Sequence, residues 1–162
     1  MTLTFIESFN GISDELHLYP KWINNGGLIF LSVAGRFGES NGAVRMLTNT
    51  YHLLAPSGNI GTTDKCIVGF AYKPDIGMDE TRVMAFWDGG VEMLKVVMNT
   101  DGTLDAVVDT TVVSSTTEKM KGGVWRYIEI KVLFHASAGT VDWQIDGVSD
   151  GGDTGKDTIY LG

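Results

Sequence analysis

Apolar and polar residues alternate through the segment Gly122–Val148, and this alternation restricts the fold more than any other feature. Every second residue from Ile128 to Phe134 is apolar, and a short turn of small residues, Ala136–Gly139, separates this run from a second one. In the second run Val141, Trp143 and Ile145 alternate with polar residues. Because side chains of a β-strand point to opposite faces in turn, the segment predicts an antiparallel hairpin with one buried face.

Similar short apolar runs recur along the chain between glycine, asparagine and aspartate residues. The turns Asp88–Gly90 and Asn99–Gly102 offer the residues that tight hairpin loops require. The expected strands are Leu28–Gly35, Ala43–Thr48, Lys65–Lys73, three within Arg82–Asp109, Thr111–Thr116, Val124–His135, Thr140–Asp146 and Thr158–Gly162. Roughly ten strands at hairpin spacing predict an all-β antiparallel sandwich or barrel. A helix of one or two turns is expected at Ser13–Trp22, and a mobile loop at Asp150–Asp157.

Length and charge limit the organisation and the partners. We expect one domain over residues 1–162, and the single cysteine, Cys66, is expected to be a buried small side chain. The formal net charge of −8 and the lack of a Lys/Arg cluster argue against nucleic acid as a partner. No apolar run is long enough for a membrane span, and the first residues lack the features of a signal peptide, so we expect synthesis in the cytoplasm.

Several segments together resemble a known group of domains. These are Phe5–Asn10, Trp22, Gly35–Met46, Ile67–Lys73, Asn99–Val107 and, as the most specific piece, Gly123–Val148. The chain resembles the concanavalin A-like (laminin G-like) jelly-roll domains that many bacteriophages encode. The resemblance implies a jelly-roll β-sandwich. Members of the family usually continue past Gly162 into one more strand, so we expect that strand to be absent here or to be replaced by a neighbouring subunit.

The resemblance also implies a function, because such phage domains are often virion proteins. We expect a non-enzymatic virion structural protein, made in the host cytoplasm, that decorates the capsid in many copies as a cement protein. Its partners would be phage capsid or tail proteins and further copies of itself, with a trimer as one option. The alternatives are a tail or fibre component that binds a glycan in the manner of a lectin, and a glycoside hydrolase.

The face of Val124–His135 that carries Glu129 argues against the hydrolase. Retaining glycosidases need two carboxyl groups about 5 Å apart. Lys131 and Leu133 follow Glu129 on the same face, so this strand provides one carboxylate and no matched partner. We therefore expect no catalytic residues and interpret Glu129 and Lys131 as part of a solvated face.

Ligand sites have only weak candidates in the sequence. Sugar stacking could use Trp22, Tyr51, Trp87 or Tyr160, although we favour core packing for each, and also for Trp125 and Trp143. The loop aspartates that could bind calcium are Asp146, Asp150, Asp153 and Asp157, but a solvated turn is the favoured interpretation. The three histidines, His17, His52 and His135, lack metal-ligand spacing, so no cofactor is expected.

Overall fold

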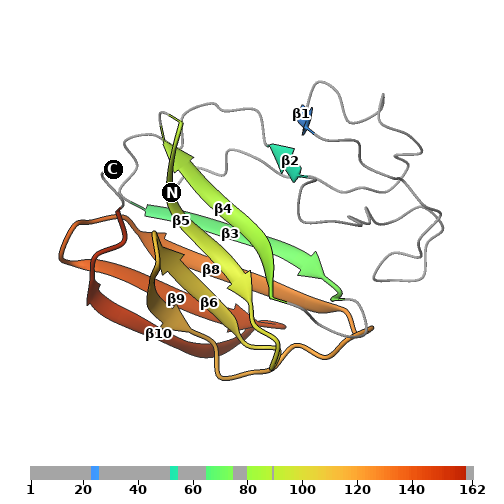
Figure 1. Cartoon of the computed structure of the whole chain (residues 1–162). Helices are drawn as coiled ribbons and strands as arrows, with labels where there is room; N and C mark the ends of the chain where they lie inside the picture. The colour runs from blue at the N-terminus through green and yellow to red at the C-terminus, as the bar shows by residue number, and fades with distance from the viewer. Residues whose placement is uncertain (1–22, 26–51, 55–64, 75–79, 89, 160–162) are drawn as a thin grey trace. The chain divides into compact units, whose positions relative to one another are not determined.

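The computed structural model describes residues 23–25, 52–54, 65–74, 80–88 and 90–159. The chain divides into two compact units, Met1–Gly58 and Asn59–Gly162. In the first unit, β1 (Ile23–Asn25) pairs antiparallel with β2 (His52–Leu54) (Figure 1). The expected helix Ser13–Trp22 and the expected strands Leu28–Gly35 and Ala43–Thr48 lie outside the described residues.

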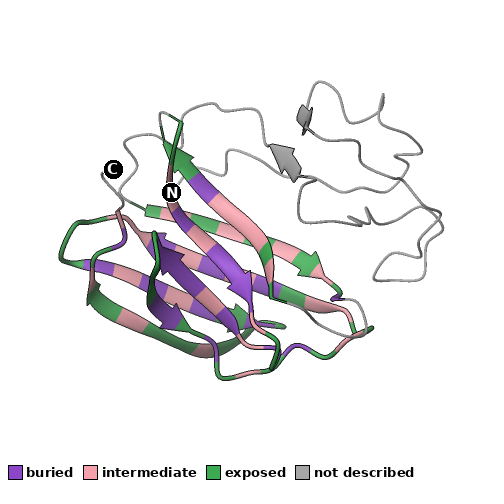
Figure 2. Ribbon diagram, in the orientation of Figure 1, coloured by how far each residue is buried: buried purple, intermediate pink, exposed green. Residues whose placement is uncertain are grey.

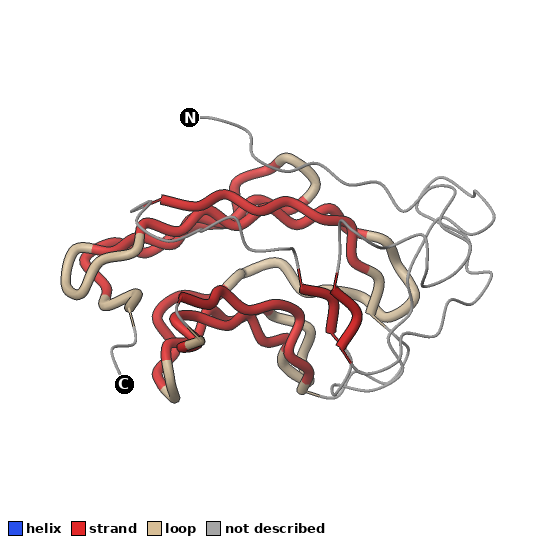
Figure 3. Tube along the Cα trace, turned by 90° about the horizontal axis from the view of Figure 1, so that it is seen from above, coloured by secondary structure: helices blue, strands red, loops and turns tan. Residues whose placement is uncertain are grey.

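The second unit is built from two four-stranded antiparallel sheets (Figure 1). One, which we call the β8 sheet, has the strand order β10-β9-β8-β3, and the other, the β5 sheet, has the order β4-β5-β6-β7. The strands are β3 (Lys65–Tyr72), β4 (Thr81–Asp88), β5 (Val91–Met98), β6 (Leu104–Val108), β7 (Thr111–Ser115), β8 (Arg126–Leu133), β9 (Gly139–Ile145) and β10 (Val148–Lys156). The all-β prediction is confirmed for the described residues, and two antiparallel layers are consistent with a β-sandwich (Figure 3).

The alternation in β8 and β9 determines which side chains form the core. Ile128, Ile130 and Val132 of β8 are completely buried, as is Val141 of β9, and Trp143 is 1% exposed. They form one apolar cluster with residues of the β5 sheet such as Phe86, Leu94, Val96, Leu104 and Ala106 (Figure 2). The hairpin predicted from the sequence is therefore confirmed, with its apolar face turned towards the other sheet.

Two of the side-chain contacts between the sheets are an indole hydrogen bond and an aromatic pair. The indole Nε1 of Trp143 in β9 donates a hydrogen bond of 3.1 Å to Oγ of Ser114 in β7. Phe86 of β4 and Phe134, which follows β8, meet edge to face with ring centroids 5.4 Å apart. Both partners are buried, so the Trp143–Ser114 hydrogen bond satisfies two polar groups that would otherwise destabilise the core.

The sequence prediction for Asp150–Asp157 as a mobile loop is wrong, because most of this segment belongs to β10. The glycines of this segment led to the prediction of a loop. In the structure they belong to an irregular edge strand, in which Gly151 and Gly155 have positive φ values of 104° and 68°. The register with β9 shifts between Ser149 and Gly152 and again between Thr154 and Lys156. Glycine therefore allows the strand to bulge without losing its pairing.

The end of the described chain also differs from the expectation. Thr158 and Ile159 follow β10 outside any strand, and residues 160–162 lie outside the described part. Thr158 is fully buried, and its hydroxyl donates to the carbonyl of Leu133 at 2.8 Å while it accepts from the amide of His135 at 2.9 Å. A buried threonine thus ties the segment after β10 to the end of β8.

Candidate functional site

The outer face of the β8 sheet carries polar side chains in two rows that run across the strands. In the first row Gly69 of β3 pairs with Glu129 of β8, Glu129 with Gln144 of β9, and Gln144 with Ser149 of β10. In the second row the residues in register are Ile67, Lys131, Asp142 and Gly152. Residues directly opposite each other on one face are about 4.5–5.5 Å apart at Cβ, so the side chains of each row can share a ligand.

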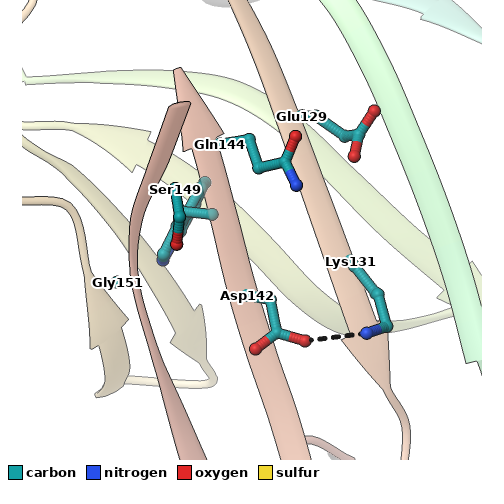
Figure 4. Close-up of a pocket in the computed structure, with 7 residues that line it drawn as sticks. Glu129, Lys131, Asp142, Gln144, Ser149 and Gly151 are labelled. Carbon is teal, nitrogen blue, oxygen red and sulfur yellow. Dashed lines mark ion pairs between the residues drawn. The ribbon is translucent and has the colours of Figure 1, made fainter. Parts of the chain in front are cut away.

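These rows surround an open hollow of about 260 Å³. Figure 4 shows Glu129 and Gln144 on adjacent strands, with the Lys131–Asp142 ion pair next to them. The residues that line the hollow are Glu129, Lys131, Asp142, Trp143, Gln144, Ser149 and Gly151. The hollow is therefore lined mainly by polar groups, in contrast to the apolar inner face of the same strands.

Lys131 and Asp142 neutralise each other at one side of the hollow. The distance from Nζ of Lys131 to Oδ2 of Asp142 is 3.1 Å. A Cβ on Gly152 would come within 2.8 Å of Oδ1 of Asp142, so the glycine leaves the space that this carboxylate occupies. The pair is half-exposed and contributes about 0–1 kcal/mol to stability, so its main effect is on the local charge.

Glu129 and Gln144 differ from this pair because their polar atoms are not engaged. Neither side chain makes a hydrogen bond or an ion pair among the interactions found for the described residues. A carboxylate offers acceptors only, whereas an amide offers both a donor and an acceptor. Gln144, the residue in register with Glu129, thus carries a side-chain amide. Asp142, which carries the carboxylate of the second row, is ion-paired with Lys131. This arrangement can bind hydroxyl groups, and the two carboxylates among the residues that line the hollow are Glu129 and Asp142.

Tyr127 lies on the same face as Glu129 and was not among the sugar-stacking candidates from the sequence. A Cβ on Gly69 would lie 2.9 Å from Cζ of Tyr127 and closer still to its hydroxyl oxygen, so the ring extends over Gly69. Tyr127 remains 36% exposed. The available signal was a glycine in the middle of β3, because such a glycine often marks the close approach of another group.

The aromatic residues proposed from the sequence for sugar stacking are not brought together by the described part of the structure. Trp87 lies near the end of β4 and is 47% exposed, so the favoured assignment of Trp87 to the core is wrong. Trp22, Tyr51 and Tyr160 lie outside the described residues. Trp143 is buried as predicted, whereas Trp125 is half-buried with Nζ of Lys73 5.9 Å from its ring centroid.

The four candidate calcium ligands each have another partner. Asp146 accepts from Arg126 and from the amide of Tyr127, Asp150 from Thr117 and Glu118, Asp153 pairs with Lys156, and Asp157 accepts from the amide of Ile159. Within the ranges that the structure describes, no group of three or more His, Cys, Asp or Glu side chains is arranged to hold a metal ion. Each of the four aspartates therefore already has a hydrogen-bond donor or a cation as its partner.

Asp150 has the most extensive of these roles. Its carboxylate accepts from the amide and the hydroxyl of Thr117 at 2.8 and 2.6 Å, and from the amide of Glu118 at 3.0 Å. Asp150 belongs to β10, whereas Thr117 and Glu118 follow β7 in the chain. The carboxylate thus joins the edge of the β8 sheet to a segment that leaves the β5 sheet.

The structure also describes the surroundings of Cys66 and His135, two further residues considered from the sequence. Cys66 is half-buried against the core, and burial raises the pKa of its thiol, which keeps it protonated and unreactive near neutral pH. The Nδ1 atom of the exposed His135 accepts from the amides of Ser137 and Ala138, so this ring closes the turn before β9. His17 lies outside the described residues, and of His52 only the backbone is described.

Comparisons with known proteins give no independent assignment. No protein-family model, no curated protein and no solved structure was found to match the chain. A search of the described residues for helices long and apolar enough to cross a membrane also found none.

Proposed function

We propose that the protein is a non-enzymatic jelly-roll component of a bacteriophage particle that acts through surface contacts. The resemblance of Gly123–Val148 and the other segments to phage jelly-roll domains supports the phage context. The all-β architecture with two antiparallel sheets agrees with the fold that this resemblance implies.

The observation that carries the proposal is the chemistry of the outer face of the β8 sheet. There Glu129 lies opposite an amide, and Asp142 is neutralised by Lys131. Such a face has groups that bind, and the ion pair of its second carboxylate, Asp142, with Lys131 supports the view that the two carboxylates are not the acid pair of a glycosidase. Binding without chemistry is what a structural or adhesive protein needs.

Attachment to the capsid is the role we favour within this proposal. Apolar side chains exposed on the second unit include Val148 at 69%, Val112 at 51% and Trp87 at 47%. Burying exposed apolar surface is a major favourable term in protein association. The chain also shows no fibre-like repeat, so decoration of the capsid in many copies, with a trimer as one arrangement, suits it better than a fibre shaft.

The test is to look for the protein in virions and to measure its return to particles that lack it. We expect mass spectrometry of purified virions to find many copies, and purified protein to sediment with particles made without it. A purified virion without the protein, together with no sedimentation on depleted particles, would refute the proposal.

A tail or fibre component that adheres to glycans is the second candidate. The uncommitted hydrogen-bonding groups of Glu129 and Gln144 favour it, because hydroxyl-rich ligands need such groups in pairs. Imaging of labelled protein on intact virions separates the two roles, since a tail location supports this candidate and an even distribution over the head supports decoration.

A further inference from the structure

We propose that His135 is a pH-sensitive latch that holds the segment after β10, residues 157–159, against the end of β8. The neutral ring closes the turn between β8 and β9, and the closed turn forms a socket for Thr158. A protonated ring cannot close this turn, so the latch opens in mild acid. The inference concerns a movement within the second unit and does not depend on any role in a particle.

The imidazole of His135 is the acceptor that closes the turn. Its Nδ1 atom accepts hydrogen bonds from the amide of Ser137 at 3.1 Å and from the amide of Ala138 at 3.0 Å. A ring nitrogen accepts only while it carries no proton, because both nitrogens of an imidazolium are donors. The two hydrogen bonds therefore require Nδ1 to be unprotonated and place the proton of the neutral ring on Nε2.

The backbone of the same residue holds Thr158. The amide of His135 donates to Oγ1 of Thr158 at 2.9 Å, and the amide of Thr158 donates to the carbonyl of His135 at 3.0 Å. The Thr158 hydroxyl donates in turn to the carbonyl of Leu133 at 2.8 Å. The ring of His135 fixes this backbone relative to the residues that follow, so releasing the ring also releases both backbone partners of Thr158.

The turn encloses the side chain of Thr158. Thr158 is completely buried, although residues 135–138 are exposed and Thr158 itself lies outside any strand. A Cβ on Gly139 would come within 2.7 Å of Cγ2 of Thr158 and closer still to its hydroxyl oxygen, so this glycine leaves the space that the threonine fills. A buried hydroxyl is tolerated when it is hydrogen-bonded. Its partners here belong to the turn, so Thr158 stays buried only while the turn is closed.

The ring of His135 is the group at this turn whose type of side chain changes charge between about pH 5 and 8. In the described part of the chain, the other titratable groups that the register and the sequence place around the turn are Lys65 opposite Leu133, Lys156 opposite Gly139, its ion-pair partner Asp153, and Asp157 next to Thr158. Lysine and aspartate side chains ordinarily titrate outside this range. The closed latch needs an unprotonated Nδ1, whereas the open latch leaves that atom free to bind a proton. Closure is therefore complete above the range in which imidazole titrates and is lost as the pH falls through it.

The experiment follows amide hydrogen exchange of the full chain by two-dimensional NMR at pH 7.5 and pH 5.0, with each rate divided by the intrinsic rate at that pH. We expect the protection of the Thr158 amide to fall about fivefold or more at pH 5.0, because the hydrogen bonds that hold the segment are lost. The amide protons of Ser137 and Ala138 should shift to lower frequency over the same range as they lose their acceptor. The protection of Ile130, in the middle of β8, should not change.

Two variants of His135 separate the titration of the ring from the fold. An asparagine oxygen can accept from backbone amides two residues further along the chain and does not titrate, so His135→Asn should keep Thr158 protected at both pH values. Alanine offers no acceptor, so His135→Ala should lower the protection of Thr158 about fivefold or more at both pH values. The matched controls His17→Asn and His52→Asn should retain the pH dependence of the unaltered chain.

Equal protection of Thr158 at pH 7.5 and pH 5.0 would overturn the proposal. A loss of protection in acid that persists in His135→Asn would overturn it too, because a group other than this ring would then be titrating. A shift of the Ser137 and Ala138 amides with Thr158 unchanged would show that the ring closes the turn without holding the segment, which also contradicts the proposal. Sedimentation with depleted particles at neutral pH is a separate measurement, so failure of the latch and failure of the particle role are distinguishable.

Discussion

The hydrogen bond between Trp143 and Ser114 is the clearest place to measure how strongly the two sheets depend on each other. Trp143 and Ser114 are 1% and 3% exposed, and the bond of 3.1 Å spans from β9 to β7. Removing one partner of a buried pair leaves the other unsatisfied, which costs about 1–3 kcal/mol. Ser114→Ala should therefore lower the free energy of unfolding by about 1–3 kcal/mol.

Trp143→Phe should cost about 2–4 kcal/mol, because it leaves Ser114 unpaired and also empties part of the volume that the indole fills. In the double variant neither polar group is present, so no buried polar group is left without a partner. Its loss of stability should be smaller than the sum of the two single losses by about 1–2 kcal/mol.

The assay is urea unfolding followed by far-ultraviolet circular dichroism, since fluorescence would change with the number of tryptophans. Trp87→Phe combined with Ser114→Ala is the matched control. Trp87 lies on β4, separated from β7 by two strands, so this cycle should be additive within about 0.5 kcal/mol. Additivity of the same size for Trp143→Phe with Ser114→Ala would refute the reasoning, because the bond would then not couple the sheets.

Three other perturbations have defined outcomes. Asp150→Ala should lower the free energy of unfolding by about 2 kcal/mol, because three donors lose an ionised acceptor. Asp153→Ala removes only an exposed pair with Lys156 and should change the free energy of unfolding by less than about 0.5 kcal/mol. Equal effects of the two variants in urea melts would contradict this expectation. Hydrogen bonds from the side chain and the backbone amide of Thr103, and then from Lys119, lower the pKa of Asp101 to about 2. The stability that the ionised Asp101 contributes is therefore complete above its ordinary pKa of 3.8 and is lost as the pH falls towards 2. Carboxyl NMR titration of Asp101 should show this midpoint, and Asp101→Asn should reduce the acid dependence of unfolding; an ordinary midpoint would disprove the assignment. The melting temperature in excess calcium should equal that in a chelator, because the four candidate aspartates already have partners. A rise of several degrees with calcium would contradict this and would indicate a calcium site.

Local sequence patterns were sufficient for the strands that alternate strongly. Ile128, Ile130 and Val132 recur with a period of two, and the turn at Asp146 and Gly147 is made by residues that both adopt positive φ, at 51° and 81°. Both signals depend on residues close together in the chain. The alternation therefore predicted β8 and β9 without any knowledge of the other sheet.

The strand β10 and the role of Asp150 could not be predicted in the same way. Gly151, Gly152 and Gly155 have no side chains to alternate, so the segment carries no period, and its pairing is fixed by β9. The acceptor role of Asp150 depends on Thr117 and Glu118, more than thirty positions earlier in the sequence. Neither relation is visible in a local pattern.

The candidate site was predicted only in part for the same reason. Glu129 and Lys131 were recognised as a polar face, but the residue opposite Glu129 depends on the register of β8 with β9, which the turn at Ala136–Gly139 sets. The position of Tyr127 over Gly69 depends on the register of β8 with β3, strands separated by more than fifty residues. Sequence reasoning thus found the face but not the row of residues across it.

Native-state hydrogen exchange tests most directly whether the two sheets enclose one core. The central strands β5 and β6 of one sheet and β8 and β9 of the other have a neighbour on both sides. If they share a core, their slowest amides should open with the same free energy, equal to that of global unfolding of the second unit, and β10 should exchange more slowly than a free peptide. Slow amides in one sheet that open several kcal/mol more easily than those in the other, or unprotected amides throughout β10, would contradict the account.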